Sequence, residues 1–183
     1  MMFELNKEFD ITLVSGIGIE DRNILIIDDF GYRNDEISDG FLNLNIKLTC
    51  AVIPGHAYST TFSKKASEKG FEIIVHMPME NSGDNRGEEN FVLLRDLDSV
   101  LVRDRIRTAF EQIPQAIGMN NHQGSKATEN LQLMKYVARS LKKKDKYFLK
   151  IIFHLLVYLI ILLHGYVLNK NYHMIFFEVL NEV

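Results

Sequence analysis

Short apolar runs alternate with longer, mixed polar and apolar stretches between about residues 24 and 149, and this alternation constrains the fold most. Each run has the length of a buried strand, and the stretches between the runs are of helical length. Strands that alternate with helices predict a parallel sheet built of βαβ units, either open or closed into a barrel. The predicted strands are Ile24–Asp29, Lys47–Ile53, Phe71–His76, Gln115–Asn120 and Lys146–Leu149.

Three of the intervening stretches carry helical signals. A helix is predicted over 98–112 with Asp98 as its N-cap, and another over 128–144, where basic residues suit the C-terminal end. A third is predicted over 58–69, closed by Gly70. The apolar faces repeat at spacings of three and four residues. Their members are Val102, Ile106, Ala109 and Ile113 in the first helix, and Leu131, Met134, Ala138 and Leu141 in the second.

The composition fits one globular domain. Hydrophobic residues make up 46% of the 183 residues and charged residues 25%, which is ordinary for a folded protein. The formal net charge of −3 gives no sign of a nucleic-acid binder. Cys50 is the single cysteine, so the chain has neither an intramolecular disulfide nor a zinc site built of several cysteines.

The two ends of the chain differ from this central pattern. Residues 1–20 are predicted to be an N-terminal extension without the apolar core of a secretory signal, which favours a cytoplasmic location. Residues 150–183 form an apolar tail that we expect to be helical. Within it, Ile151–Leu168 contains no charged residue over 18 positions. That length is the lower limit for a membrane-spanning helix, and a buried helix is the alternative.

Two adjacent carboxylates, Asp28 and Asp29, end the first predicted strand. Side chains alternate along a strand, so both can present carboxylates together only where the strand gives way to its loop. Like charges this close raise one pKa unless a cation or hydrogen bonds hold both groups ionised. The pair therefore suggests a metal ligand beside a general base. The alternative is a solvated loop or a cap of the next helix.

Two histidines follow other predicted strands. His76 ends the third strand and His122 follows the fourth. Because the carboxyl ends of parallel strands meet at one edge, Asp29, His76 and His122 would form an oxygen-nitrogen-nitrogen set suited to zinc or another first-row divalent ion. Taken singly, a histidine at a strand end is more often a hydrogen-bonded structural residue.

Further polar residues lie near these strand ends. Glu80 is a candidate fourth ligand, or a partner that fixes the tautomer of His76. Asn120, Asn121 and Ser125 are candidates to bind a polar substrate, or residues that shape a turn. His56, after the second strand, is interpreted as a turn residue.

Four sequence blocks resemble the divergent polysaccharide deacetylase family in order and approximate spacing. They are Ile26–Tyr32 (IIDDFGY), Ala51–Gly55 (AVIPG), His76–Glu80 (HMPME) and Gly118–Ser125 (GMNNHQGS). The resemblance covers roughly residues 20 to 149. It implies a distorted (β/α) barrel with a divalent metal, expected to be zinc, at the carboxyl ends of the strands. It also implies removal of N- or O-acetyl groups from polysaccharides, and hence a glycan as substrate and the cell envelope as location.

The resemblance also implies roles for single residues. Asp28 is similar to the catalytic base of this superfamily, Asp29 to its metal-binding aspartate and His76 to the first histidine of its metal motif. Glu80 stands where the second histidine of that motif is expected, and His122 is the residue expected to supply the missing nitrogen. Asn121 is a candidate donor to the oxyanion, and Glu80 and Ser125 are candidates to contact the substrate.

The resemblance stops after Tyr147–Leu149. There the family continues with an Asp-Ser-containing segment and further strands, whereas this chain has Lys150 and the apolar tail. We therefore expect a partial deacetylase domain over 21–149 and a tail outside the family pattern, and a frameshift would explain the composition of that tail. The leading interpretation is a deacetylase fold in a truncated copy without its catalytic acid. The alternative is an inactive domain that binds a glycan or an envelope partner, anchored in a membrane by Ile151–Leu168.

Overall fold

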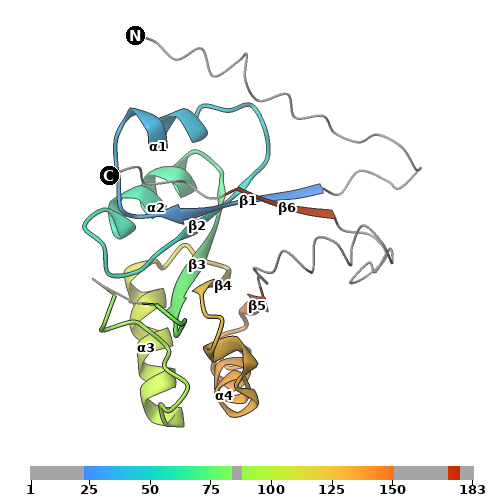
Figure 1. The fold of residues 1–183 in the computed structure, drawn as a ribbon. Helices are drawn as coiled ribbons and strands as arrows, with labels where there is room; N and C mark the ends of the chain where they lie inside the picture. Colours follow the sequence, from blue (N-terminus) through green and yellow to red (C-terminus); the bar gives the residue numbers. More distant parts are fainter. Residues whose placement is uncertain (1–22, 84–87, 151–172, 178–183) are drawn as a thin grey trace.

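The strands of this protein form one parallel sheet. The computed structural model describes residues 23–83, 88–150 and 173–177. The strands are β1 (Asn23–Phe30), β2 (Thr49–Val52), β3 (Glu72–Met79), β4 (Gly118–Gln123), β5 (Tyr147–Leu149) and β6 (His173–Phe177). Their order in the sheet is β5-β4-β3-β2-β1-β6, and every neighbouring pair is parallel (Figure 1).

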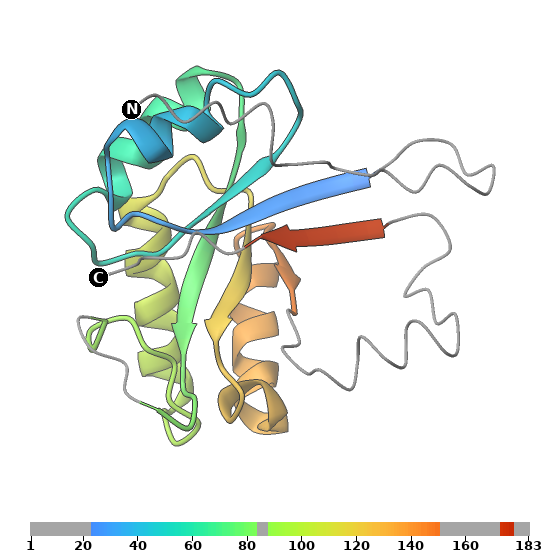
Figure 2. The same cartoon turned by 45° about the horizontal axis from the view of Figure 1, so that its top comes forward.

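Helices connect the consecutive strands from β1 to β5. They are α1 (Glu36–Phe41), α2 (Ser59–Glu68), α3 (Ser99–Gln112) and α4 (Leu131–Lys142), with a 3-10 turn, η1 (Ala127–Glu129), before α4. Their apolar residues pack with alternate strand residues in the main core, on one face of the sheet. Figure 2 shows α3 and α4 side by side behind β3 and β4.

The other side of the sheet carries the candidate site. Ala51 on β2 packs with Ile26 and Ile74 in a small apolar cluster that is separate from the main core. We call the side with this cluster the second face. Asp28 and His76 follow Ile26 and Ile74 by two residues and are both buried, so they extend the second face toward the carboxyl ends of their strands.

The predicted alternation of strands and helices is confirmed, and the bounds of β3 and β4 differ most from the predicted ones. β3 continues past His76 to Met79, and β4 runs from Gly118 to Gln123. Residues 74–79 of β3 pair with the whole of β4. His76, predicted as the last residue of its strand, and His122, predicted to follow a strand, therefore both lie inside strands.

The helix predictions are confirmed in position and partly corrected in orientation. α3 begins after Asp98, whose side chain caps it by accepting from two backbone N–H groups, and α2 is followed by Gly70 in the left-handed conformation. The predicted buried face of α4 is wrong in part, since Leu131 is 69% exposed and Ala138 is exposed. Leu131 is the first residue of α4, and the first buried residue of the helix is Leu133. The buried residues of α4 are Leu133, Val137, Ser140 and Leu141.

The expected barrel is not closed within the described residues, where β5 and β6 are the edges of an open sheet. What the structure establishes is an α/β fold in which five parallel strands, β1 to β5, alternate with helices.

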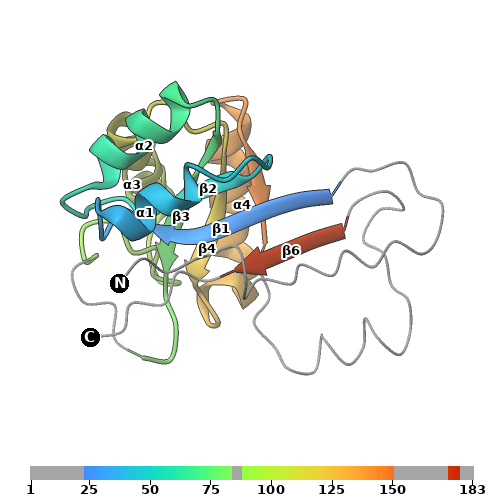
Figure 3. The same cartoon turned by 90° about the horizontal axis from the view of Figure 1, so that it is seen from above.

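The C-terminal tail differs from the expectation in one segment. The predicted helix over Ile151–Leu168 lies outside the described residues, as does the extension over 1–20. Residues His173–Phe177 instead form β6, which pairs with β1 in parallel (Figure 3), so the expectation of a helical tail is corrected there. Apolar and aromatic residues are typical of strands, which accounts for this pairing. In the described part of the chain, no helix has the length and hydrophobicity needed to cross a membrane.

Candidate metal site

A bulge near the carboxyl end of β1 brings Asp28 and Asp29 to the same place. Three steps along β1, from Ile27 to Phe30, match two along β2. Asp29 has a φ of +66°, in the left-handed region that aspartate enters more readily than most residues. The bulge interrupts the alternation of side chains, so both carboxylates reach His76. From the sequence, the two carboxylates were expected to come together only beyond the strand, but they do so within β1.

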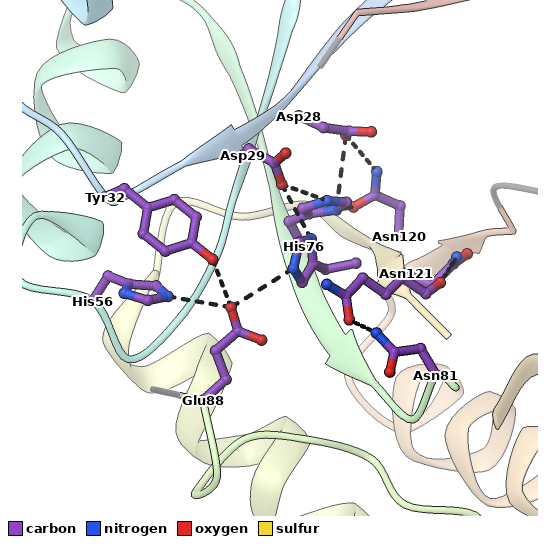
Figure 4. Close-up of polar contacts among 11 residues, drawn as sticks. Asp28, Asp29, Tyr32, His56, His76, Asn81, Glu88, Asn120 and Asn121 are labelled. Atoms are coloured by element: carbon purple, nitrogen blue, oxygen red, sulfur yellow. Dashed lines mark hydrogen bonds and ion pairs between the residues drawn. The ribbon is translucent and has the colours of Figure 1, made fainter. Parts of the chain in front are cut away.

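Asp29 and His76 point toward each other (Figure 4), and His122 joins them in one cluster of possible metal ligands. Asp29 Oδ1 lies 3.2 Å from His76 Nε2 and 3.1 Å from His122 Nδ1. The three ligand atoms lie within 4.8 Å of one another, and the two imidazole rings meet edge to face. Among the described residues, no well-aligned hydrogen bond reaches Asp29 Oδ1, although this oxygen is buried. A buried carboxylate oxygen that faces two imidazole nitrogens is a fitting ligand set, so the cluster could hold a metal ion.

The charges of this cluster depend on one another. Burial favours the neutral form of Asp29, but the facing imidazoles of His122 and His76 outweigh it and hold the pKa of Asp29 well below its usual range. Burial likewise disfavours the charged form of His76, yet the carboxylates of Asp29 and Asp28 raise its pKa above the ordinary value. The site thus keeps a negative charge on Asp29 and attracts a compensating positive charge.

Asn120 on β4 links Asp28 to His76. Its Nδ2 donates to Asp28 Oδ1 at 2.9 Å, and its Oδ1 lies 2.7 Å from His76 Nδ1. A carboxylate only accepts, so the amide must turn its nitrogen to Asp28 and its oxygen to His76. His76 Nδ1 therefore carries a proton, and in the neutral ring Nε2 is free to bind a cation.

Asp28 is the carboxylate next to the ligand set. It is buried, its Oδ1 lies 3.7 Å from His76 Nδ1, and burial raises its pKa despite the opposing effect of His76. A raised pKa makes a carboxylate a better proton acceptor than an exposed aspartate.

The structure does not bring every predicted site residue to this cluster. Glu80 lies at the end of β3 and pairs with Arg95, whose N–H donates to Glu80 Oε2 at 2.9 Å. Asn121 pairs in register with Met77, on the face of the main core, and its Nδ2 donates to the backbone oxygen of Gln123. Ser125 is exposed in the turn after β4.

A third carboxylate lies near the cluster and was not predicted from the sequence. Glu88 is 3% exposed and lies in the connection between β3 and α3. The hydroxyl of Tyr32 donates to Glu88 Oε1 at 2.7 Å, and His56 Nε2 lies 3.3 Å from the same oxygen. His122 Nε2 lies 3.7 Å away. No motif in the sequence marks Glu88, and His56 was interpreted as a turn residue, although it contacts this group.

Comparisons with known proteins identify the family of this chain. Residues 25–151 match the model of the family described as divergent polysaccharide deacetylase. Over 125 residues, 68% of this chain, the sequence is 34% identical to the uncharacterized protein YibQ of Escherichia coli K12 and 35% identical to an uncharacterized protein of Haemophilus influenzae. The match covers 39% and 44% of those two proteins, so the chain spans about two fifths of the length of these relatives.

A solved structure shares the fold. The crystal structure of an uncharacterized protein from Agrobacterium tumefaciens C58 superposes with a TM-score of 0.64 at 17% identity, covering 87% of this chain and 64% of that one. The family model spans more than half of the chain, and the four blocks singled out in the sequence lie within or at its bounds. The chain belongs to the divergent polysaccharide deacetylase family.

Proposed function

We propose that this chain is a metal-dependent hydrolase that removes acetyl groups from a glycan by cleaving a C–N bond. The observation that carries the proposal is the buried oxygen of Asp29, which faces two imidazole nitrogens next to the Asp28 carboxylate. Asp29, His76 and His122 would hold a divalent ion. One carboxylate and two imidazoles are the ligands of many catalytic zinc sites, so we expect zinc.

A zinc ion in such a site supplies a Lewis acid for a carbonyl oxygen and makes water a stronger nucleophile at neutral pH. Asp28 would take the proton from that water, because it is adjacent to the ligands and its pKa is raised. Asn120 holds the Asp28 carboxylate in place through a hydrogen bond of 2.9 Å. Asp28 is thus the base and Asn120 its positioning residue.

The substrate would approach from the carboxyl edge of the sheet. Ser125 is exposed in the turn after β4 and stays a candidate to contact a glycan. Glu80 and Asn121 are better explained as structural residues, since one holds Arg95 and the other faces the main core. We also propose that β1 to β6 belong to a (β/α) barrel of the family type. They would form the section of that barrel that carries the metal.

Metal content and acetate release test the proposal together. We expect purified wild-type protein to bind one zinc ion and to release acetate from N-acetylglucosamine oligomers. Asp28→Asn should keep the zinc and lose the release, whereas His122→Ala should lose both. Acetate release by Asp28→Asn at the wild-type rate would refute the role of Asp28. Glycan binding with neither zinc nor release would favour the inactive binding domain instead.

A further inference from the structure

Glu88 contacts side chains that lie at or after the carboxyl ends of several strands. Tyr32 follows β1, His56 follows β2 and His122 lies on β4, while Glu88 itself belongs to the segment between β3 and α3. Tyr32 and His56 both point to Glu88 Oε1 (Figure 4). His122 approaches the same oxygen. A buried carboxylate with this many polar neighbours is fixed in one orientation.

The hydrogen bonds to Glu88 keep it charged. The Tyr32 hydroxyl donates to Glu88 Oε1 at 2.7 Å and His56 Nε2 lies 3.3 Å from the same oxygen, and both contacts favour the ionised carboxylate. The rings of Tyr32 and His56 lie in direct contact, with centroids 3.9 Å apart, so the two donors also support each other. Glu88 therefore presents a fixed negative charge toward its remaining neighbour, His122.

His122 lies between two carboxylates and turns a different nitrogen to each. Its Nδ1 lies 3.1 Å from Asp29 Oδ1 and its Nε2 lies 3.7 Å from Glu88 Oε1. A neutral imidazole carries one N–H, so an Nδ1 that binds a cation leaves the proton on Nε2, which faces Glu88. The 3.7 Å separation is longer than a hydrogen bond, and contacts of this kind often tighten once the ligand is bound.

We propose that Glu88 is a positioning residue for His122, which holds the Nε2–H tautomer and directs Nδ1 to the metal. This inference rests on the metal site of the proposed function. His76 has the opposite arrangement, since its Nδ1 faces Asn120 and its Nε2 faces Asp29. Each histidine of the site thus has its own buried partner, an amide for His76 and a carboxylate for His122.

Zinc affinity and the tautomer of His122 test the inference. Glu88→Gln keeps the shape of the side chain and removes its charge. We expect it to weaken zinc binding by about 10- to 100-fold, as the loss of a partner of a metal-bound histidine usually does. Tyr32→Phe removes one hydroxyl that holds Glu88 and should shift the affinity less, in the same direction. The control is Glu111→Gln, an exposed glutamate on α3 paired with Arg107, which should leave the affinity unchanged.

Long-range ¹H–¹⁵N spectra of the zinc-loaded wild-type protein supply a second readout. We expect His122 to show a protonated Nε2 and a zinc-bound Nδ1. Zinc bound through Nε2, or Glu88→Gln with unchanged affinity, would overturn the inference and leave the metal site standing. A loss in Glu88→Gln as complete as that in His122→Ala would make Glu88 itself a ligand and would also overturn it. Wild-type protein that binds no zinc would refute the proposed function instead.

Discussion

Replacing Asn120 by alanine should destabilise this protein strongly, because it removes two hydrogen bonds at once. Asn120 is fully buried, donates to Asp28 Oδ1 at 2.9 Å and accepts from His76 Nδ1 at 2.7 Å. Alanine would leave a buried carboxylate and a buried imidazole N–H without these partners, since Asp28 and His76 are each 2% exposed.

The size of the effect follows from these two contacts. A hydrogen bond to a charged group contributes about 1.5–3 kcal/mol, and a buried donor left unsatisfied costs about 1–3 kcal/mol. We therefore expect Asn120→Ala to lower the free energy of unfolding by roughly 3–6 kcal/mol at neutral pH, out of a total of about 5–15 kcal/mol for a domain.

Urea unfolding followed by circular dichroism measures this difference. Asn34→Ala is the matched control, because Asn34 is exposed and its amide oxygen accepts from Lys65 at the surface. The control should change the free energy by no more than about 0.5 kcal/mol. A loss below about 1 kcal/mol in Asn120→Ala would refute the reasoning, since unsatisfied buried groups cannot cost so little.

Four further predictions concern other parts of the structure. Cys50 is fully buried and burial raises the pKa of its thiol, so Ellman's reagent should label it only in unfolded protein; rapid labelling of native protein would contradict this. Asp35→Ala breaks the capping box with Ser38 and should cost about 1 kcal/mol in urea unfolding. The pKa of Asp35 is lowered in the fold, so this stabilisation is present at neutral pH and should fade as the pH falls through that pKa; a difference that persists in acid would argue against the cap. Zinc at 100 times its dissociation constant should stabilise the wild-type protein by about 2.7 kcal/mol and leave His122→Ala unchanged in a thermal melt. Ala51 lies on β2 between the strands that carry Asp29 and His76, so Ala51→Leu should lower the free energy of unfolding by about 1–3 kcal/mol through overpacking. It should also weaken zinc binding. Unchanged zinc binding would show that the site does not need a small residue at this position.

The sequence predicts the elements of this fold better than their exact ends. Apolar periodicity finds α3, and the cap Asp98 marks its start, because both signals are local. The extent of β3 and β4 depends on their pairing with each other. β3 consequently continues beyond His76, where the predicted strand ended, and β4 includes His122, which was predicted to follow it. β6 depends on the free edge of β1, which no local pattern reveals.

The candidate site, like the fold, can be predicted from the sequence only in part. Asp29, His76 and His122 could be grouped from the sequence because parallel strands end at one edge. The bulge that turns Asp28 and Asp29 together is a property of the mismatch between β1 and β2, and it leaves no mark in the residues of β1 alone. Glu88 comes close to His122 only through the path of the long connection between β3 and α3, so the sequence does not predict this contact.

The contact between the aspartates and His76 has to cross an intervening strand. β1 and β3 are separated by β2, and neighbouring strands lie about 4.8 Å apart, so the backbones of β1 and β3 are roughly 10 Å apart. Yet His76 lies 3.2 Å from Asp29 and 3.7 Å from Asp28. The register places the bulge of β1 next to Ala51, a residue of the second face whose side chain is a single methyl group. The small residue on β2 leaves the room, and the bulge on β1 turns both carboxylates into it. The candidate metal site therefore depends on the small size of Ala51, which supplies no ligand atom, as well as on the three residues that would bind the ion.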